Sequence, residues 1–267
     1  MKVILETRDL NRSFGAVSAA RDINVIVTEG ETVGIIGANG AGKTTFVNIV
    51  TGYVKPTSGT VHFDAREITQ LSPRQIVQAG LARSFQVPQL FASATVFDNL
   101  LIAVGIAQSK QRAFWRLLHE PERIAQCERM LERFQIAEYR DQSVSTLPQG
   151  VRKLLDIAMA MVRDPKLMLL DEPTSGITSE EKFPLMDIVV GALQRQGLTV
   201  LFIEHDMDVI SRYAERVMAF YDGEILADGP TAQVLADPAV RERVIGEGVI
   251  SSASVLGNAD GMSDAAH

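Results

Sequence analysis

The apolar positions of the chain form two kinds of pattern, which predict strands in some segments and helices in others. Short β-branched or aliphatic runs occupy residues 25–27, 32–36, 60–63, 167–170 and 199–203. The last two runs are continuously apolar apart from Thr199, which is typical of strands that a parallel sheet buries on both faces. We therefore expect short strands joined by turns over residues 1–87, and further strands after residue 163.

Between residues 88 and 163 the spacing changes to that of helices. Ile124, Cys127, Leu131 and Phe134 recur at steps of three and four, with Glu, Arg and Gln between them. This spacing places the four side chains on one face of a helix, the face expected to pack against the core.

Three further helices are predicted outside that segment. They begin at Lys43, at Pro73 and near residue 179. For the third, Thr178 and Glu181 have the spacing of a capping box. Pro184 lies too deep for a helix that starts there, so this helix either begins later or kinks.

Strand and helix alternation, interrupted by a helical insertion, predicts an α/β fold with an inserted helical lobe. Near the end, Asp222-Gly223 separates two short apolar runs and predicts a hairpin. We expect one domain over residues 1–250. Its predicted parts are core segments 1–87 and 164–235, a helical lobe 88–163 and a C-terminal extension 236–250. The small, polar residues 251–267 are expected to be a disordered tail.

Composition narrows the class of protein. The 267 residues include 26 Lys and Arg against 33 Asp and Glu, a net charge of −7, which argues against binding nucleic acid by phosphate neutralisation. A single cysteine, Cys127, excludes an internal disulfide and suggests a reducing compartment. The apolar run 100–107 is far shorter than the roughly 20 residues of a membrane-spanning helix, and Glu6 comes too early for a secretory signal. We expect a soluble chain, or one that other subunits hold at a membrane.

A phosphate-binding loop lies between a predicted strand and a predicted helix. It matches G-x-x-x-x-G-K-[ST] and consists of Gly37, Ala38, Asn39, Gly40, Ala41, Gly42, Lys43 and Thr44. Backbone N–H groups and the helix N-terminus would surround a phosphate, Lys43 would reach the β- and γ-phosphates, and Thr44 would bind Mg²⁺. With Thr45, these residues are the predicted ATP site; the alternative is an accidental glycine-rich turn. The chain lacks the Asn-Lys-x-Asp base reader of GTPases.

Two carboxylates follow the apolar run 167–170. Asp171 is placed to hold Mg²⁺, and Glu172 is the candidate general base that activates the attacking water. Neighbouring residues of a strand point to opposite faces, so the backbone must turn at the end of this strand for both acids to serve one site. The alternative is a pair of acids that caps the next helix.

With these motifs in order, residues 3–249 resemble the ATP-binding cassette (ABC) ATPases, the nucleotide-binding subunits of ABC transporters. The resemblance implies a P-loop NTPase (RecA-like) core with an N-terminal antiparallel β subdomain and an inserted α-helical lobe. It implies that Gln86 contacts Mg²⁺ and its water, that His205 contacts the γ-phosphate and holds Glu172, and that Phe14 stacks on adenine. Each has a simpler alternative: a loop amide, a surface histidine and a core aromatic, respectively.

The segment 202–207, Phe-Ile-Glu-His-Asp-Met, is similar to ATPases of branched-chain amino-acid importers and their urea relatives. So are residues 95–100, the extra segment 105–121 and the ending 241–248. A lipopolysaccharide-export ATPase shares part of this pattern and is the nearest alternative. Trp115, in the extra segment, is more simply explained as a packing residue.

The family's signature, Leu-Ser-Gly-Gly-Gln, is altered here. The aligned residues are Leu147, Pro148, Gln149, Gly150 and Val151. In the family this segment grips the γ-phosphate held by the partner cassette, and Pro148 brings neither a hydroxyl nor an N–H to that grip. Pro148 also has a benign explanation, since proline is favoured at the first helical position. The D-loop, residues 174–178, departs as well, with Ile177 and Thr178 where the family often has Leu-Asp.

The resemblance implies an ATPase on the cytoplasmic face of a membrane, whose partners are integral membrane permease subunits, a second cassette and, indirectly, a periplasmic solute-binding protein. We hypothesise an asymmetric pair in which a different ATPase closes this chain's P-loop. A ribosome or DNA-repair cassette is less consistent with a single P-loop and no sustained heptads. A protein that binds ATP without turnover is less consistent with the presence of Glu172 and His205.

Overall fold

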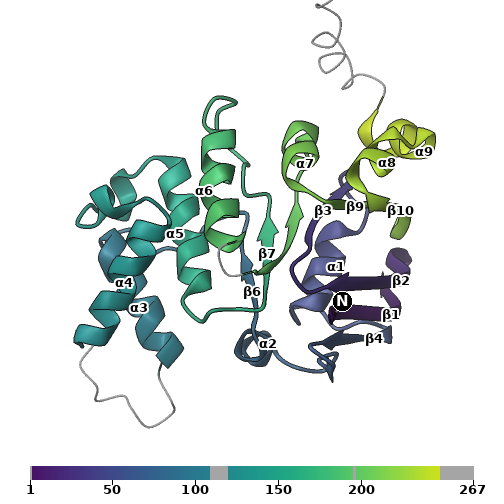
Figure 1. The fold of residues 1–267 in the computed structure, drawn as a ribbon. Coiled ribbons are helices and arrows are strands. Elements are labelled where there is room, and N and C mark those ends of the chain that lie inside the picture. The colour runs from purple at the N-terminus through teal and green to yellow at the C-terminus, as the bar shows by residue number, and fades with distance from the viewer. Residues whose placement is uncertain (1, 109–119, 195–196, 247–267) are drawn as a thin grey trace, which may run out of the picture.

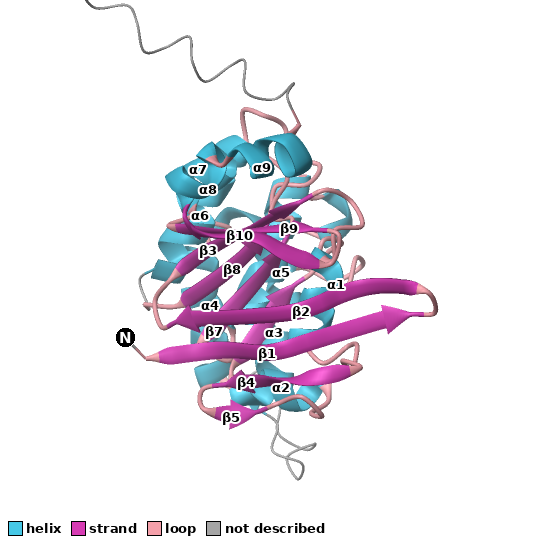
Figure 2. Ribbon diagram, turned by 90° about the vertical axis from the view of Figure 1, so that its right-hand side faces the viewer, coloured by secondary structure: helices cyan, strands magenta, loops and turns pink. Residues whose placement is uncertain are grey.

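The computed structural model describes residues 2–108, 120–194 and 197–246, which form two sheets and the helices around them (Figure 1). Sheet A is antiparallel, in the order β2 (Val17–Thr28), β1 (Val3–Phe14), β4 (Ser58–Phe63) and β5 (Arg66–Glu67). Figure 2 shows its strands side by side. Sheet B has the order β10 (Glu224–Pro230), β9 (Arg216–Tyr221), β3 (Thr32–Gly37), β8 (Thr199–Ile203), β7 (Leu167–Asp171) and β6 (Leu81–Ser84). Its pairs are parallel except β10–β9.

Helices cover both faces of sheet B. They are α1 (Lys43–Val50), α2 (Pro73–Ala79), α3 (Val96–Gln108), α4 (Pro121–Arg133), α5 (Gln149–Met161), α6 (Lys182–Gln194), α7 (Met207–Tyr213), α8 (Thr231–Ala236) and α9 (Pro238–Val240). Single turns lie at Ala137–Tyr139 and Val144–Thr146, and a π-helical turn at Arg241–Ile245. Figure 1 shows α3, α4 and α5 together at one side, away from β1 and β2.

Two apolar cores lie on opposite faces of sheet B. In β7, Leu167 and Leu169 join α1 and sheet A in one core, while Met168 and Leu170 join the second core with α3 to α6. Strand β8 alternates in the same way. The apolar runs predicted as doubly buried strands are therefore confirmed, because α1 and sheet A cover one face of sheet B and α3 to α6 cover the other.

Local chemistry explains where several elements begin and end. Helix α2 starts with Pro73 at its first position, preceded by a capping box of Ser72 and Gln75. The predicted hairpin joins β9 to β10, and both Asp222 and Gly223 have positive φ, 48° and 80°, as a type I′ turn requires.

One expectation differs from the structure, and the structure decides between two alternatives left open by the sequence. Strands β1 and β2 each span 12 residues, so the first segment is not made only of short strands. Helix α6 begins at Lys182, so the later start is the alternative that the structure adopts, with Pro184 in its first turn. There a missing N–H costs little. The Thr178 hydroxyl donates to the Glu181 carboxylate at 3.0 Å, one turn ahead of α6.

Helices α3, α4 and α5 lie within the predicted lobe 88–163, and α9 with the π-helical turn lies within the predicted extension 236–250. The predicted tail 251–267 and most of segment 105–121, with Trp115, lie outside the described residues. Among residues 2–108, 120–194 and 197–246, no helix has the length and apolar character needed to cross a membrane.

Candidate functional site

The phosphate loop connects β3 to α1, as its sequence context predicts. Gly37 and Gly42 have φ of 156° and 102°. A Cβ on Gly37 would lie 2.6 Å from the Phe220 carbonyl oxygen, and one on Gly42 would lie 2.6 Å from the Ala19 carbonyl oxygen. Only glycine fits at either place, and the loop is therefore pressed between β9 and β2.

Lys43 folds back over the loop that precedes it. Its Nζ donates to the carbonyl oxygens of Gly37 and Ala38 at 2.5 and 3.1 Å. Burial lowers the pKa of this lysine, while the charges of Glu172 and Asp171 act in the opposite direction. The ammonium thus lies inside the loop, bonded to its carbonyl oxygens.

A cavity of about 130 Å³ opens along the loop. It is lined by Asn39, Gly40, Ala41, Gly42, Lys43, Thr44, Thr45, Glu172 and His205. The structure therefore brings residues 39–45 of the predicted phosphate site, the predicted base and the predicted switch histidine to one place.

Three polar side chains meet beside this cavity. Glu172 Oε1 lies 3.0 Å from His205 Nε2, and Glu172 Oε2 accepts a hydrogen bond from Gln86 Nε2 at 2.7 Å. The residues follow the adjacent strands β7, β8 and β6, at their carboxyl ends, where α/β sheets bind ligands. Gln86 and His205 are therefore not isolated surface groups.

Glu172 has φ of 48°, a left-handed conformation that is uncommon for a residue with a side chain. This turn directs Glu172 toward Gln86 and His205, whereas Asp171 contacts Arg83. The predicted change of direction at the strand end is thus present in the backbone.

Arg83 is a residue of the site that the sequence analysis missed. Its Nη2 lies 2.5 Å from Asp171 Oδ2, its Nη1 donates to Asn48 Oδ1 at 2.7 Å, and both members of the ion pair are buried. Its guanidinium lies 5.0 Å from the centre of the Phe85 ring. The available signal was a single cation within the otherwise buried strand β6.

The predicted magnesium ligands are all oxygen donors, the type that Mg²⁺ prefers. They are the Thr44 hydroxyl, the Asp171 carboxylate, one oxygen of which is paired with Arg83, and the Gln86 amide oxygen; the hydrogen bond of Gln86 to Glu172 uses its nitrogen. Within the described part of the chain, no three His, Cys, Asp or Glu side chains gather as a metal site. The donor set fits an ion that takes its remaining ligands from phosphates and water.

Phe14 lies at the tip of the β1–β2 hairpin, opposite Val17. It is 47% exposed, so it is not a core aromatic. The Arg12 guanidinium lies 4.5 Å from the centre of its ring. A ring exposed on a hairpin that touches the phosphate loop is available for stacking.

The altered signature, residues 147–151, lies at the N-terminus of α5 and does not line the cavity at the chain's own P-loop. Leu147 is buried, and Pro148 is the residue just before the helix, its carbonyl oxygen accepting from the Arg152 N–H at 3.2 Å. Gln149 Nε2 donates to the Ser175 carbonyl oxygen at 3.2 Å. The side-chain amide of Gln149 is therefore engaged with this chain's own D-loop.

Buried charges on α5 and near His205 were also missed. Lys153 and Asp156 contact the segment around Gln86, and Glu204 accepts from the Thr174 N–H and hydroxyl at 2.8 and 2.7 Å. Burial raises the pKa of Asp156 to about 6 and also raises the pKa of Glu204. Asp156 lies between two apolar residues, Leu155 and Ile157, but its partners Phe85 and Gln89 lie 67 or more residues away in the sequence.

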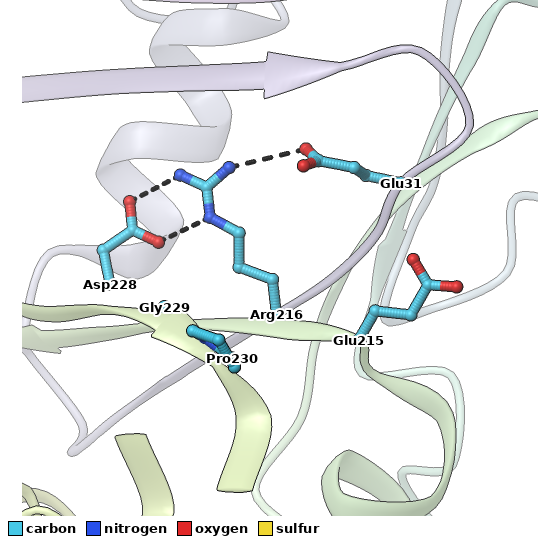
Figure 3. A pocket seen from close by; sticks show the side chains of 6 residues that line it. All are labelled: Glu31, Glu215, Arg216, Asp228, Gly229 and Pro230. Carbon is cyan, nitrogen blue, oxygen red and sulfur yellow. Dashed lines mark hydrogen bonds and ion pairs between the residues drawn. The ribbon is translucent and has the colours of Figure 1, made fainter. Parts of the chain in front are cut away.

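A larger cavity, about 460 Å³, lies at the opposite end of β3 (Figure 3). Arg216 pairs there with both oxygens of Asp228 at 2.6 Å, approaches Glu31 at 3.4 Å and donates to the Ile26 carbonyl oxygen at 2.8 Å. These groups satisfy one another and join β9 and β10 to β2. We assign this arginine a structural role.

Comparisons with known proteins agree with this geometry. The family model described as "ABC transporter" matches residues 20–175. The branched-chain amino acid transport ATP-binding protein LivG of Escherichia coli strain K12 is 35% identical, with 91% of this chain and 98% of LivG covered. BraF of Pseudomonas aeruginosa is 34% identical over the same shares. The crystal structure of a nucleotide-free ATP-binding cassette from an ABC transporter superposes with a TM-score of 0.80 at 30% identity, covering 92% of this chain and all of that one.

Proposed function

This chain belongs to the ABC transporter family of ATPases, and on that premise we propose that it powers an importer of branched-chain amino acids or similar small solutes. It is an ATP-binding and ATP-hydrolysing cassette. The relatives named LivG and BraF are branched-chain amino acid transport proteins, which favours the importer over the lipopolysaccharide-export alternative. The transported solute is the part of the proposal taken from these relatives.

One observation carries the catalytic part of the proposal. Gln86, Glu172 and His205 converge beside the phosphate loop, with Glu172 bonded to the other two at 2.7 and 3.0 Å. A carboxylate held between an amide and an imidazole, next to a phosphate site, is suited to orient and deprotonate a water molecule.

In the reaction, the water oxygen bonds to the γ-phosphorus and the bridging oxygen leaves with ADP. Glu172 accepts the proton of the water, while Lys43 and the loop N–H groups hold the phosphate oxygens. Bound Mg²⁺ would neutralise phosphate charge, held by Thr44, Asp171 and Gln86. Both carboxylate oxygens of Glu172 are bonded, one to Gln86 and the other to His205. A base needs one of them, so we expect the amide of Gln86 to yield its place to water when ATP binds.

The second cassette is the next part of the proposal. Pro148 offers no N–H, and the Gln149 amide contacts Ser175 of its own chain, so few donors remain to grip a partner's nucleotide. Charge-assisted hydrogen bonds contribute about 1.5–3 kcal/mol each. These losses support an asymmetric pair with a different ATPase.

We further propose attachment to integral membrane permease subunits on the cytoplasmic face, with a periplasmic solute-binding protein acting indirectly. The support is apolar surface beside the catalytic Gln86. Val87 is 69% exposed and Phe91 is 52% exposed. Large exposed apolar groups near a moving site suit a protein partner.

The test is to purify an affinity-tagged chain from detergent-solubilised membranes of its source cells and to identify the co-purifying subunits by mass spectrometry. The complex is then placed in ATP-loaded proteoliposomes with its solute-binding protein. We expect ATP-dependent uptake of radiolabelled leucine or valine. Uptake of urea in place of leucine would redirect the solute, and co-purification without any membrane subunit would contradict the importer.

A further inference from the structure

One face of α5 carries three polar side chains among apolar neighbours. Gln149, Lys153 and Asp156 stand at positions i, i+4 and i+7, which share a face of a helix with 3.6 residues per turn. The intervening Leu154 and Leu155 are buried. The same helix begins at the altered signature, so this polar face starts where a second cassette would dock.

Lys153 joins the backbones of two candidate catalytic residues. It is 2% exposed, and its Nζ donates to the carbonyl oxygens of Gln86 at 2.5 Å and of Glu172 at 3.2 Å. The side chains of these two residues are themselves hydrogen-bonded at 2.7 Å. One buried ammonium therefore fixes the backbones of both Gln86 and Glu172, the two residues proposed to contact the attacking water.

Asp156, one turn further along α5, binds the loop that contains Gln86 through the backbone N–H groups of that loop. Its carboxylate accepts from the backbone N–H groups of Phe85 at 3.3 Å and of Gln89 at 3.1 Å. Gln86 lies between these two points, so its backbone is fixed on both flanks. Gln149 completes the face by contacting the D-loop at Ser175.

The arrangement is costly, which points to a use. Burying an ammonium disfavours its charged form, and burial does lower the pKa of Lys153, although Asp156 and the nearby carboxylates offset part of that effect. Glu172 also keeps a left-handed backbone, a strain that persists only where neighbours fix it. The hydrogen bond from Lys153 to the Glu172 carbonyl is one of the contacts that fix it.

We propose that Lys153 is a positioning residue for ATP hydrolysis. It sets the distance between Gln86 and Glu172, and because it lies on α5, that distance depends on the position of the signature helix. The inference rests on the proposed roles of Glu172 and Gln86. Lys153 contacts backbone carbonyls only and is no part of the phosphate cavity. Its loss should therefore slow the chemical step and leave nucleotide binding unchanged.

The chain offers a matched control. Lys55 also donates to two backbone carbonyl oxygens, those of Thr69 at 3.3 Å and Leu71 at 2.6 Å, but at the far end of α1 from the phosphate loop. Removing either lysine frees two carbonyl groups. Only Lys153 connects them to the site.

The experiment compares K153M, K153R, K55M and E172Q in the full chain, alone and in the membrane complex that co-purifies with it. It measures Tm, the Kd of a fluorescent ATP analogue, and kcat and KM for ATP. Small misplacement of catalytic groups costs up to about 100-fold in rate. We expect K153M to lower kcat about 10- to 100-fold with KM and Kd within about twofold, and K153R to recover most of kcat. K55M should lower Tm but keep kcat.

Equal losses of kcat in K153M and K55M, or a raised KM with normal kcat in K153M, would overturn the proposal. If K153M does not fold, K153Q, which keeps a neutral donor, replaces it. A wild-type kcat in K153Q would also overturn the proposal. Full turnover by E172Q would instead refute the proposed base, and so separates failure of that role from failure of the positioning role.

Discussion

At the scale of single residues, Glu172 shows how one backbone angle divides the work of two acids. Its φ of 48° turns its carboxylate toward Gln86 and His205, while Asp171 stays with Arg83. A strand that continued straight would have sent the second acid to the opposite face of the sheet.

Replacing Glu172 by Gln should remove the base without changing its size. We expect kcat to fall by about 10²- to 10⁴-fold, the usual contribution of a general base. The Kd for MgATP should stay within a few-fold, since Lys43 and the loop are untouched. Phosphate release gives kcat, and fluorescence titration gives Kd. Comparable loss of nucleotide binding would show that Glu172 serves binding.

Arg83 and Asp171 form a buried ion pair, and removal of one partner leaves a buried charge uncompensated. R83M should lower the free energy of unfolding by about 3–5 kcal/mol, measured by urea denaturation. The double variant R83M/D171N should recover part of that loss. R212M, at the exposed pair of Arg212 with Asp187, is the control and should change stability little. An unchanged R83M would mean that water reaches Asp171.

Asp156 makes a prediction about pH. Burial raises its pKa to about 6 from 3.8, so the folded chain binds this proton more tightly than the unfolded chain. Its contribution to stability is therefore full below about pH 4 and is lost as the pH rises through about 6. The stability of D156N relative to wild type should rise by roughly 2–3 kcal/mol between these values and stay level above pH 7. Glu204 shifts in the same direction and remains in both proteins. A flat difference would contradict the shift.

At the scale of elements, the sequence was most informative where a pattern is local. Helix α1, Lys43–Val50, begins at the predicted residue because the loop chemistry fixes its start. Strands β7 and β8 were recognisable because both of their faces are apolar. The convergence of Gln86, Glu172 and His205 came from the family resemblance, and the structure places the three together.

The long strands β1 and β2 were harder to predict for a physical reason. Asp9 and Asp22 have φ of 47° and 45°, and the pairing register shifts between Thr7 and Leu10 and between Leu10 and Arg12. Such irregularities break the alternation that reveals a strand. Arg83, Lys153 and Asp156 were missed because their partners are more than 60 residues away or come from another element.

The connection between β3 and α1 depends on Gly42. An alanine there would be strained by φ of 102° and would place its Cβ 2.6 Å from the Ala19 carbonyl oxygen. The G42A substitution should lower the free energy of unfolding by about 1–3 kcal/mol or more. It should also abolish ATP binding. G191A, within α6 and with open space around it, should be neutral or slightly stabilising. Thermal unfolding and ATP titration measure both, and normal ATP binding by G42A would contradict the fit described for the loop.

At the scale of the whole molecule, the asymmetric pair predicts an oligomeric state. E172Q with MgATP should remain a monomer in light scattering, because Pro148 and the engaged Gln149 leave a weak grip on a second copy. Addition of the different cassette should give a dimer. A homodimer of E172Q alone would refute the asymmetry and make a symmetric transporter the better hypothesis.

Gln86, Glu172 and His205 each follow one of three adjacent strands, β6, β7 and β8. Neighbouring strands lie about 4.8 Å apart, so the hydrogen bonding between strands sets the distances between the backbones that carry the three catalytic groups. This has a consequence for engineering: the two sheets can be kept while the helical lobe, residues 88–163, is exchanged. A chimera in which the lobe of another cassette replaces residues 88–163 should still hydrolyse ATP, provided that the new lobe has a cation at position 153.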